Sequence, residues 1–329
     1  MIIETPSRLH ITLIDLNGSI GRIDGGVGLT IGKPKLILEA KPQDKDIDIN
    51  FKESQSLSEE LMNDYRVKIE NTVKKITDFL KIDSGFKFNV EKVYPAHSGL
   101  GSGTQLSLAT AKLVLKLNDH DMSAFQMAKL VGRGGTSGIG VIAFDYGGFI
   151  IDGGHKANEK PDFLPSSASM ASPAPLISRY DFPQDWDVVL AIPNVSAGAS
   201  GQKEVNIFQE HCPIPLNEVQ KLSHILLMKM MPSVVEKDLD SFGSAVNEIQ
   251  DIGFKKIEVE FQDPIINELM ENMRDTGAAG VGMSSFGPTV YAVTDTNTRD
   301  ISKIAQSTMK EIGGRVIVTK AKNTGSIIK

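Results

Sequence analysis

The stretch best suited to chemistry is Val93–Leu108, VYPAHSGLGSGTQLSL, where glycines alternate with small polar residues. Glycine lets backbone N–H groups come close to a ligand, and the hydroxyls between the glycines add donors. Behind the loop, Leu106, Leu113 and Leu117 repeat with helical spacing, and a helix N-terminus favours a bound anion. The alternative is a tight turn with a helix cap, since no lysine follows the last glycine as in a Walker A loop. The residues predicted to bind phosphate here are Gly99, Gly101, Ser102, Gly103, Thr104 and Gln105.

Polar residues also gather near the start of the chain, where Arg8 and His10 share a predicted strand. An arginine fork binds a carboxylate or phosphate, and a histidine donates to a substrate. The alternatives are a structural ion pair for Arg8 and a simple hydrogen bond for His10. In the loop that follows, Asp15 and Asn17 are predicted to bind hydroxyl groups of a substrate, with turn capping as the alternative.

Later segments supply further candidates. Arg133 and Ser137 flank a second glycine-rich turn and are predicted to reach a phosphate. Asp152 and His155, in IDGGH, are predicted to form a proton-transfer pair, or else to cap each other. Lys203 and Glu204, in SGQKE, are predicted on a lid, with a solvated surface as the alternative.

A third glycine-rich segment, Thr276–Thr294, precedes a predicted strand. Ser284 and Ser285 within it are predicted to close the substrate site, and simple turn chemistry is the alternative.

The composition limits the classes of partner. The chain has 329 residues, 40% of them hydrophobic, and a formal net charge of −6, so it lacks the basic excess that nucleic acid requires. Its single cysteine, Cys212, excludes an internal disulfide and a cysteine metal cluster. The N-terminus does not look like a signal peptide and no apolar stretch is long enough for a membrane span. We therefore expect a cytoplasmic protein with small-molecule substrates.

Helices and strands are predicted in an irregular order, which favours an α+β fold over a doubly wound sheet. Hydrophobic periodicity predicts a helix at Ser58–Leu80 and another directly after the first glycine loop. It predicts further helices at Ser123–Val131, Val219–Met230, Leu239–Ile249, Pro264–Met273 and Ile301–Ile312. Alternation predicts strands at Ile2–Leu16, Leu29–Ala40, Asp46–Phe51, around Phe86–Val90, and at Gly148–Asp152, Trp186–Ile192 and Arg315–Thr319. Asp15–Gly28 is predicted as a loop. The Pro- and Ser-rich segment Ala157–Ser178 is predicted as a domain boundary or a mobile loop, with domains at 1–165 and 166–329.

Three motifs in this order resemble the GHMP superfamily of small-molecule kinases. They are PSRLH at Pro6–His10, PAHSGLGSG at Pro95–Gly103 and GVGMSSFGPTVYAV at Gly280–Val293. The resemblance runs over essentially the whole chain and implies a GHMP kinase-like two-domain fold. The chain departs from the kinases after Gly138-Ile139-Gly140, where Val141 stands instead of the acid that many members use for phosphoryl transfer.

Longer strings are similar to one branch, the β-ribofuranosylaminobenzene 5′-phosphate synthases of archaeal methanopterin biosynthesis. They are RLHITLIDLNGSIGRIDGGVGLTI, GLGSGTQLSLA, SGIGVIAFDYGGFIIDGGH and IPNVSAGASGQKEVNIF. This resemblance implies condensation of phosphoribosyl pyrophosphate with 4-hydroxybenzoate or 4-aminobenzoate to a C-riboside, with loss of CO₂ and pyrophosphate. It also implies Mg²⁺ with unassigned ligands, no organic cofactor and a possible homodimer. A GHMP-type kinase using ATP, and a ligand-binding protein without catalysis, are the competing hypotheses.

Overall fold

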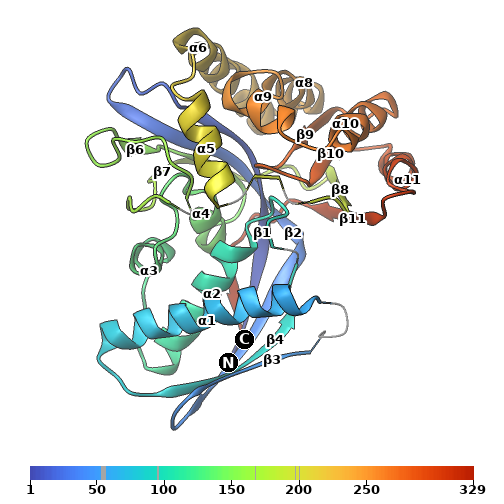
Figure 1. The fold of residues 1–329 in the computed structure, drawn as a ribbon. Coiled ribbons are helices and arrows are strands. Elements are labelled where there is room, and N and C mark those ends of the chain that lie inside the picture. Colours follow the sequence, from blue (N-terminus) through green and yellow to red (C-terminus); the bar gives the residue numbers. More distant parts are fainter. Residues whose placement is uncertain (53–56, 95, 167, 197, 200) are drawn as a thin grey trace.

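The computed structural model describes residues 1–52, 57–94, 96–166, 168–196, 198–199 and 201–329. Pro95, in the first glycine-rich motif, lies outside the described residues. The two termini lie together, because the last strand pairs with the first and places Ile328 opposite Ile3 (Figure 1).

The strands form two sheets. The larger has the order β12-β1-β2-β4-β3, with β5 beside β2, β7 beside β5 and β6 on β2, whereas the smaller has the order β11-β8-β10-β9. All of these strand pairs are antiparallel except β3 with β4. The strands are β1 (Ile2–Asp15), β2 (Arg22–Gln43), β3 (Ile47–Phe51), β4 (Gly85–Lys92), β5 (Phe149–Asp152), β6 (His155–Lys156), β7 (Leu176–Tyr180), β8 (Asp187–Pro193), β9 (Gly280–Met283), β10 (Val290–Thr294), β11 (Gly314–Lys320) and β12 (Ile327–Ile328).

The helices gather in two groups, α1 to α4 on one side of the molecule and α6 to α11 on the other, with α5 between them (Figure 1). A π-helical turn at Leu226–Met230 joins α6 to α7. The helices are α1 (Glu59–Leu80), α2 (Ser102–Leu117), α3 (Ala124–Val131), α4 (Ile139–Asp145), α5 (Gln202–His211), α6 (Leu216–Ile225), α7 (Met231–Glu236), α8 (Leu239–Ile249), α9 (Gly253–Glu260), α10 (Ile265–Asp275) and α11 (Thr298–Thr308). Within the described ranges, every helix is too short or too polar to cross a membrane.

Several predicted elements are confirmed because their signals are local. Ser58 caps α1 by accepting from the Leu61 N–H, and Ser123 starts α3 with a reciprocal capping box to Gln126. The α+β fold class is likewise confirmed. The division at residue 165 stays a prediction. The larger sheet also includes β7 and β12, from beyond that residue.

The prediction of a loop over Asp15–Gly28 is wrong for its second half, because β2 already begins at Arg22. The glycines there serve close packing. A Cβ on Gly28 would lie 2.3 Å from Ile139 of α4, and one on Gly26 would lie 2.6 Å from the Asp152 carboxylate. Helix α4 was not predicted, because its seven residues follow a glycine-rich turn and carry little periodicity.

Strand β1 does not keep a single alternation. Its pairing with β2 shifts between His10 and Thr12, so Ile11 is an extra residue and the side-chain parity changes beyond it. The sequence pattern predicted Leu9, Ile11 and Leu13 on one face. Leu9 and Ile11 join the main core, but Leu13 lies with His10 in a cavity.

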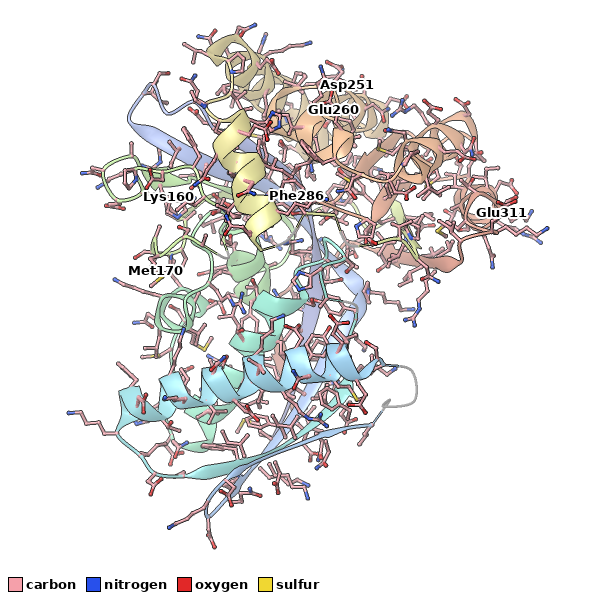
Figure 2. All side chains as sticks on the ribbon, in the orientation of Figure 1. Lys160, Met170, Asp251, Glu260, Phe286 and Glu311 are labelled. Carbon is pink, nitrogen blue, oxygen red and sulfur yellow. The ribbon has the colours of Figure 1, made fainter. Side chains whose placement is uncertain are left out.

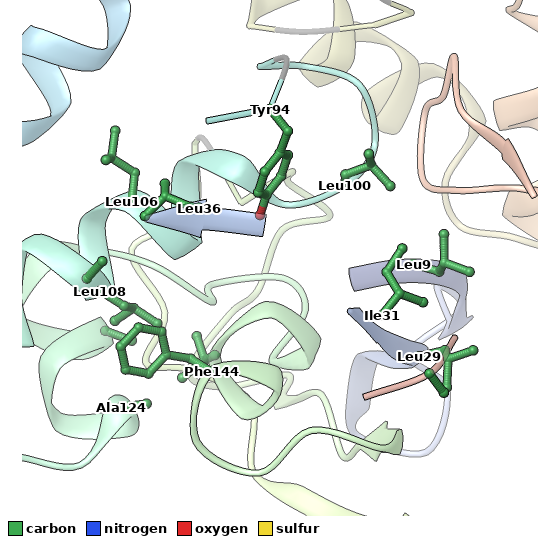
Figure 3. Close-up of a cluster of buried hydrophobic side chains, with 14 of the residues drawn as sticks. Leu9, Leu29, Ile31, Leu36, Tyr94, Leu100, Leu106, Leu108, Ala124 and Phe144 are labelled. Atoms are coloured by element: carbon green, nitrogen blue, oxygen red, sulfur yellow. The ribbon is translucent and has the colours of Figure 1, made fainter. Parts of the chain in front are cut away.

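The main core holds the first glycine loop by its apolar residues. Leu100, between Gly99 and Gly101, and Leu106, beyond the last loop glycine, are 1% and 0% exposed and belong to the same buried cluster as Leu9 and Tyr94 (Figure 3). The loop backbone is therefore anchored from behind while its glycines face the cavity described next.

Candidate active site

The first glycine loop forms one wall of a cavity of about 350 Å³, which we call the loop cavity. Gly99 and Gly101 have φ of +79° and +82°, a left-handed conformation that favours glycine. Gly101 is the residue before α2, and no described side chain caps that helix. The first N–H groups of α2 are thus placed to bind an anion. The loop cavity is lined by Arg8, Asp64, Lys68, Ala96, His97, Gly99, Gly101, Ser102, Gly103, Thr104, Arg133, Ala199, Gly201, Glu204, Ser285 and Phe286.

Three cations face this loop. Lys68 and Arg133 come close to Gly103, since a Cβ there would lie 3.8 Å from the lysine Nζ and 3.9 Å from a guanidinium nitrogen of Arg133. The third, Arg8, donates to the Gly99 carbonyl. Lys68 also pairs with Asp64 one turn away on α1. Together they give the loop cavity a positive edge around the α2 N-terminus.

A second cavity of about 160 Å³, which we call the inner cavity, adjoins the first. The two share Arg8, Glu204, Ser285 and Phe286, so the arginine stands at their junction. Phe286 lies beside α5 in Figure 2, and its ring is 6.5 Å from that of Phe208 on this helix. The inner cavity is lined by Arg8, His10, Leu13, Thr136, Ser137, Pro165, Ser166, Glu204, Phe208, Glu258, Ser285 and Phe286.

Burial sets the protonation of the two strand residues. Burial lowers the pKa of Arg8 to about 10, while Tyr94 and Glu258 oppose the shift, so the guanidinium stays charged at neutral pH. Burial, then Arg8 and Lys255, hold the pKa of His10 well below its usual range. Both His10 ring nitrogens lack a hydrogen-bond partner among the described residues. His10 is thus a neutral, unpaired donor and acceptor at the inner cavity.

The third glycine-rich segment closes onto the first. Ser284 Oγ donates to the Gly99 carbonyl at 2.7 Å and accepts from the His10 N–H at 2.9 Å. The Ser285 N–H donates to the His10 carbonyl at 2.9 Å. Ser284 therefore fixes two motifs together, and Ser285 lines both cavities.

Some predicted site residues lie elsewhere. The Gln105 amide donates to the Gly140 carbonyl at 2.7 Å and the residue lines neither cavity, because it joins α2 to α4. Asp15 accepts from the N–H groups of Asn17 and Gly18, and Asn17 donates to the Ile214 carbonyl. Both form the turn after β1 and neither lines a cavity, so the capping alternative describes them. Lys203, on α5, is exposed and lines neither cavity.

The predicted pair of Asp152 and His155 does not form. Asp152 accepts from the Gly138 N–H at 2.8 Å, the Gly154 N–H at 3.0 Å and Ser137 Oγ at 3.2 Å. Burial raises the pKa of Asp152 to about 6, although these three hydrogen bonds oppose the shift. Its carboxylate holds the turn that presents Ser137 to the inner cavity.

His155 belongs to a separate buried network. Its Nδ1 lies 2.6 Å from Asp24 Oδ2, and Lys160 Nζ donates to both Asp24 oxygens at 3.1 and 2.9 Å. Lys160 also donates to Thr136 Oγ1 at 2.9 Å and to the Leu164 carbonyl at 2.8 Å. We call Asp24, His155 and Lys160 the ionic network. It lies behind the cavity wall, whose Thr136 and Pro165 it supports.

Sequence reasoning missed part of the site. Asp64 and Lys68 share a face of α1, and their i,i+4 spacing was a signal that could have been used. Lys255 and Glu258 belong to α9, a helix that was not predicted. Both are essentially buried and form an ion pair. Phe208 and Phe286 are further lining residues that sequence reasoning missed, whereas Glu204, predicted on a lid together with Lys203, lines both cavities.

The inference drawn from Val141, which the sequence comparison placed where many kinases carry an acid, needs a correction. Its side chain is 2% exposed within the main core and lines neither cavity, so an acid there would not face a ligand. Its neighbour Gly140 is the residue that faces the glycine loop, since a Cβ there would lie 3.3 Å from Thr104. A carboxylate is absent at this place too, because the residue is glycine.

Known proteins share this architecture. The family models described as GHMP kinases N terminal domain and GHMP kinases C terminal match residues 68–148 and 230–310. Among solved structures, that of L. major mevalonate kinase in complex with R-mevalonate is similar over 98% of this chain and 96% of its own. The TM-score is 0.71 at 15% identity, a likeness that shows the fold alone. The fold is thus that of the GHMP kinases.

Closer relatives define the family. The β-ribofuranosylphenol 5′-phosphate synthase of Methanothermobacter thermautotrophicus is 51% identical over 328 residues, which are 100% of this chain and 98% of that protein. The protein of the same name from Methanocaldococcus jannaschii is 48% identical over 333 residues, 99% of each. The chain belongs to the β-ribofuranosylphenol 5′-phosphate synthase family, and the resemblance seen in its motifs is confirmed.

Proposed function

We propose that this chain joins phosphoribosyl pyrophosphate to 4-hydroxybenzoate or 4-aminobenzoate through a carbon–carbon bond, with loss of CO₂ and pyrophosphate, in methanopterin biosynthesis. Membership in the synthase family supports the reaction class. The observation that carries the proposal is the junction at Arg8. The loop cavity on one side and the inner cavity on the other both reach the Arg8 guanidinium.

The loop cavity suits the pyrophosphate donor. Its glycine loop and α2 N-terminus supply backbone donors, and Lys68 and Arg133 supply positive charge. Both stabilise a leaving group whose negative charge grows as the bond to ribose breaks. Arg8 extends this field to the junction.

The inner cavity suits a single aromatic ring. Its volume of about 160 Å³ is close to the roughly 150 Å³ in which a buried apolar cavity holds benzene. Leu13, Phe208 and Phe286 give apolar wall, and neutral His10 gives a hydrogen-bonding group. The ring can therefore be oriented and separated from water.

The bond must form at the junction, because ribose C1 comes from the loop cavity and the aryl carbon from the inner cavity. Departure of pyrophosphate leaves an oxocarbenium-like ribose. The ring carbon that bears the carboxylate attacks it, with that carboxylate held by Arg8. The para substituent spreads the positive charge, and loss of CO₂ then restores the aromatic ring.

Magnesium fits the residues of the loop cavity. Asp64 and Glu204 present carboxylates there, and Mg²⁺ is usually held by one or two carboxylates together with phosphate oxygens and water. Over the described part of the chain, no three metal-ligating side chains come together, so substrate oxygens would complete the shell. When bound, the ion would neutralise charge on pyrophosphate. Activity after chelation and Mg²⁺ addition tests this expectation.

Carboxyl-labelled 4-hydroxybenzoate tests the reaction directly. We expect labelled CO₂ and pyrophosphate in a ratio of one to one, and a ribosylated product without the label that resists acid hydrolysis. Label retained in a ribosylated product would contradict the C-riboside mechanism.

The competing function is a small-molecule kinase, and only the similarity of the fold supports it. Substrate-dependent ADP production would establish it. Nucleotide binding alone would not, because the same loop binds phosphate of either substrate. The cytoplasmic location and the homodimer stay predictions, which cell fractionation and light scattering of the purified enzyme would test.

A further inference from the structure

Glu258 is a buried carboxylate that the reaction described above does not use. It lies on α9, is 2% exposed, lines the inner cavity and forms an ion pair with Lys255. The lysine is fixed in turn, since its Nζ donates to the carbonyls of Met283 and Ser285 at 3.3 and 3.2 Å. The carboxylate is therefore held in place at the wall of the cavity.

The position of Arg8 defines which end of the ring this carboxylate meets. The aryl carbon that bears the carboxylate must lie at the junction beside Arg8, so the para substituent points away from the junction into the inner cavity. Three acidic residues line the two cavities in the described structure. Asp64 lines only the loop cavity, Glu204 lines both, and Glu258 lines only the inner cavity.

We propose that Glu258 is the catalytic base that takes the proton of the para hydroxyl group during attack; this inference rests on the proposed function. As the ring electron pair bonds to ribose C1, pyrophosphate leaves with the C1–O pair. The hydroxyl proton passes to Glu258 and its O–H pair becomes the carbonyl of a cyclohexadienone. CO₂ then leaves, its C–C pair returns to the ring, and the resulting phenolate takes the proton back. Protons and electrons balance without a co-reactant.

The surroundings favour Glu258 over His10 for this role. Burial raises the pKa of Glu258, and Lys255 and Arg8 oppose the shift, which yields a carboxylate more basic than an exposed one. The pKa of His10 is lowered by burial and by the same two cations, so His10 is a weak base. His10 instead orients the substrate by a hydrogen bond.

The test compares 4-hydroxybenzoate with 3,5-difluoro-4-hydroxybenzoate, whose fluorines acidify the phenol so that it needs no base. Glu258→Gln should lower kcat/KM for 4-hydroxybenzoate by about 100-fold or more, the usual worth of a general base. The same variant should lower kcat/KM for the difluoro compound much less. This compound reacts as a phenolate, which the glutamine amide can stabilise with a hydrogen bond, whereas the Glu258 carboxylate would repel it. The ratio of the two values should therefore fall at least about tenfold.

Two further variants keep the result decisive. Glu260→Gln, on the same helix but exposed and paired only loosely with Lys256, is the matched control and should leave the ratio unchanged (Figure 2). If Glu258→Gln does not fold, Lys255→Met/Glu258→Gln removes both ends of the ion pair and should give the same fall in the ratio.

An equal loss for both substrates in a folded variant would overturn the role of Glu258, as would a collapse of the ratio in His10→Gln instead. Product analysis of the wild-type enzyme distinguishes a failure of the role of Glu258 from a failure of the proposed reaction. If it releases CO₂ and pyrophosphate one to one while Glu258→Gln keeps the ratio, only the base is wrong. If it forms no C-riboside, the proposed function fails and this inference with it.

Discussion

The loop cavity and the inner cavity adjoin the same arginine, yet the chain builds them differently. Seven of the sixteen residues that line the loop cavity come from one short segment, residues 96–104, whose glycine backbone opens α2. The inner cavity presents side chains from β1, the turn before α4, α5, α9 and the third glycine segment. Backbone sites depend on local conformation, whereas a side-chain cavity depends on how distant segments pack. We therefore expect the two to respond differently to mutation.

Arg8→Met should have the largest effect, because within the described structure it removes the one cation that lines both cavities. We expect kcat/KM to fall by about 10³-fold, with weaker binding of both phosphoribosyl pyrophosphate and the benzoate. Steady-state kinetics with each substrate varied would measure this. Arg315→Met, at an exposed position of β11, is the control. A loss confined to one substrate would assign Arg8 to a single cavity.

Lys160→Met should affect the inner cavity alone. It leaves Asp24 buried with one cation fewer and releases the Leu164 carbonyl and Thr136, at a cost of about 3 kcal/mol in the free energy of unfolding. The KM of the benzoate should rise while that of phosphoribosyl pyrophosphate stays constant.

Denaturant unfolding and kinetics below the transition would show both effects of Lys160→Met. Lys156→Met, in the same segment but exposed and 3.8 Å from its partner Glu159, should change neither quantity. Equal changes in the KM of both substrates would contradict the expectation that the ionic network supports the inner cavity alone.

Gly101→Ala should affect the loop cavity more than the inner cavity, and Gly101→Val more strongly. The residue has φ of +82°, and an added Cβ would lie 3.1 Å from the Arg8 guanidinium. We expect affinity for phosphoribosyl pyrophosphate to fall about 10- to 100-fold, with the fold intact. Isothermal titration would measure it.

The control for Gly101→Ala is Gly21→Ala. Gly21 has φ of +80°, and an added Cβ there meets no described heavy atom within 4 Å. It carries the same backbone strain without the contact. Unchanged affinity in folded Gly101→Ala would exclude the loop from the site.

Asp152→Asn should have the smallest effect. It tests whether Asp152 supports the wall of the inner cavity without taking part in the reaction. A carboxyl group with a native pKa of about 6 binds more protons folded than unfolded, so its contribution to stability falls as pH rises from about 4 to 6. The variant should lose this part of the pH dependence of stability. Its melting temperature should differ from that of the wild type by a few degrees, and this difference should change between about pH 4 and 6. A constant difference would show that Asp152 is not buried as a proton-binding group.

Much of the frame could be predicted from the sequence. The stripe and cap of α1, the capping box of α3 and the glycine loop before α2 follow from spacing within a few residues, and the structure confirms them. Arg8 and His10 could be named as candidates because they share a predicted strand that leads into the polar loop at Asp15 and Asn17. The motifs in their order pointed to the family that the relatives confirm.

The sequence by itself therefore determined the elements with local signals, the glycine loop before α2 and the family. Only the tertiary structure decided that Asp152 and His155 serve separate hydrogen-bond networks, that Leu13 lines the inner cavity beyond the bulge, and that Glu258 lines it too. The reason is the range of the interactions. His10 and Ser284 meet across 274 residues, and such contacts are selected by the burial of whole faces, which no local pattern of residues encodes.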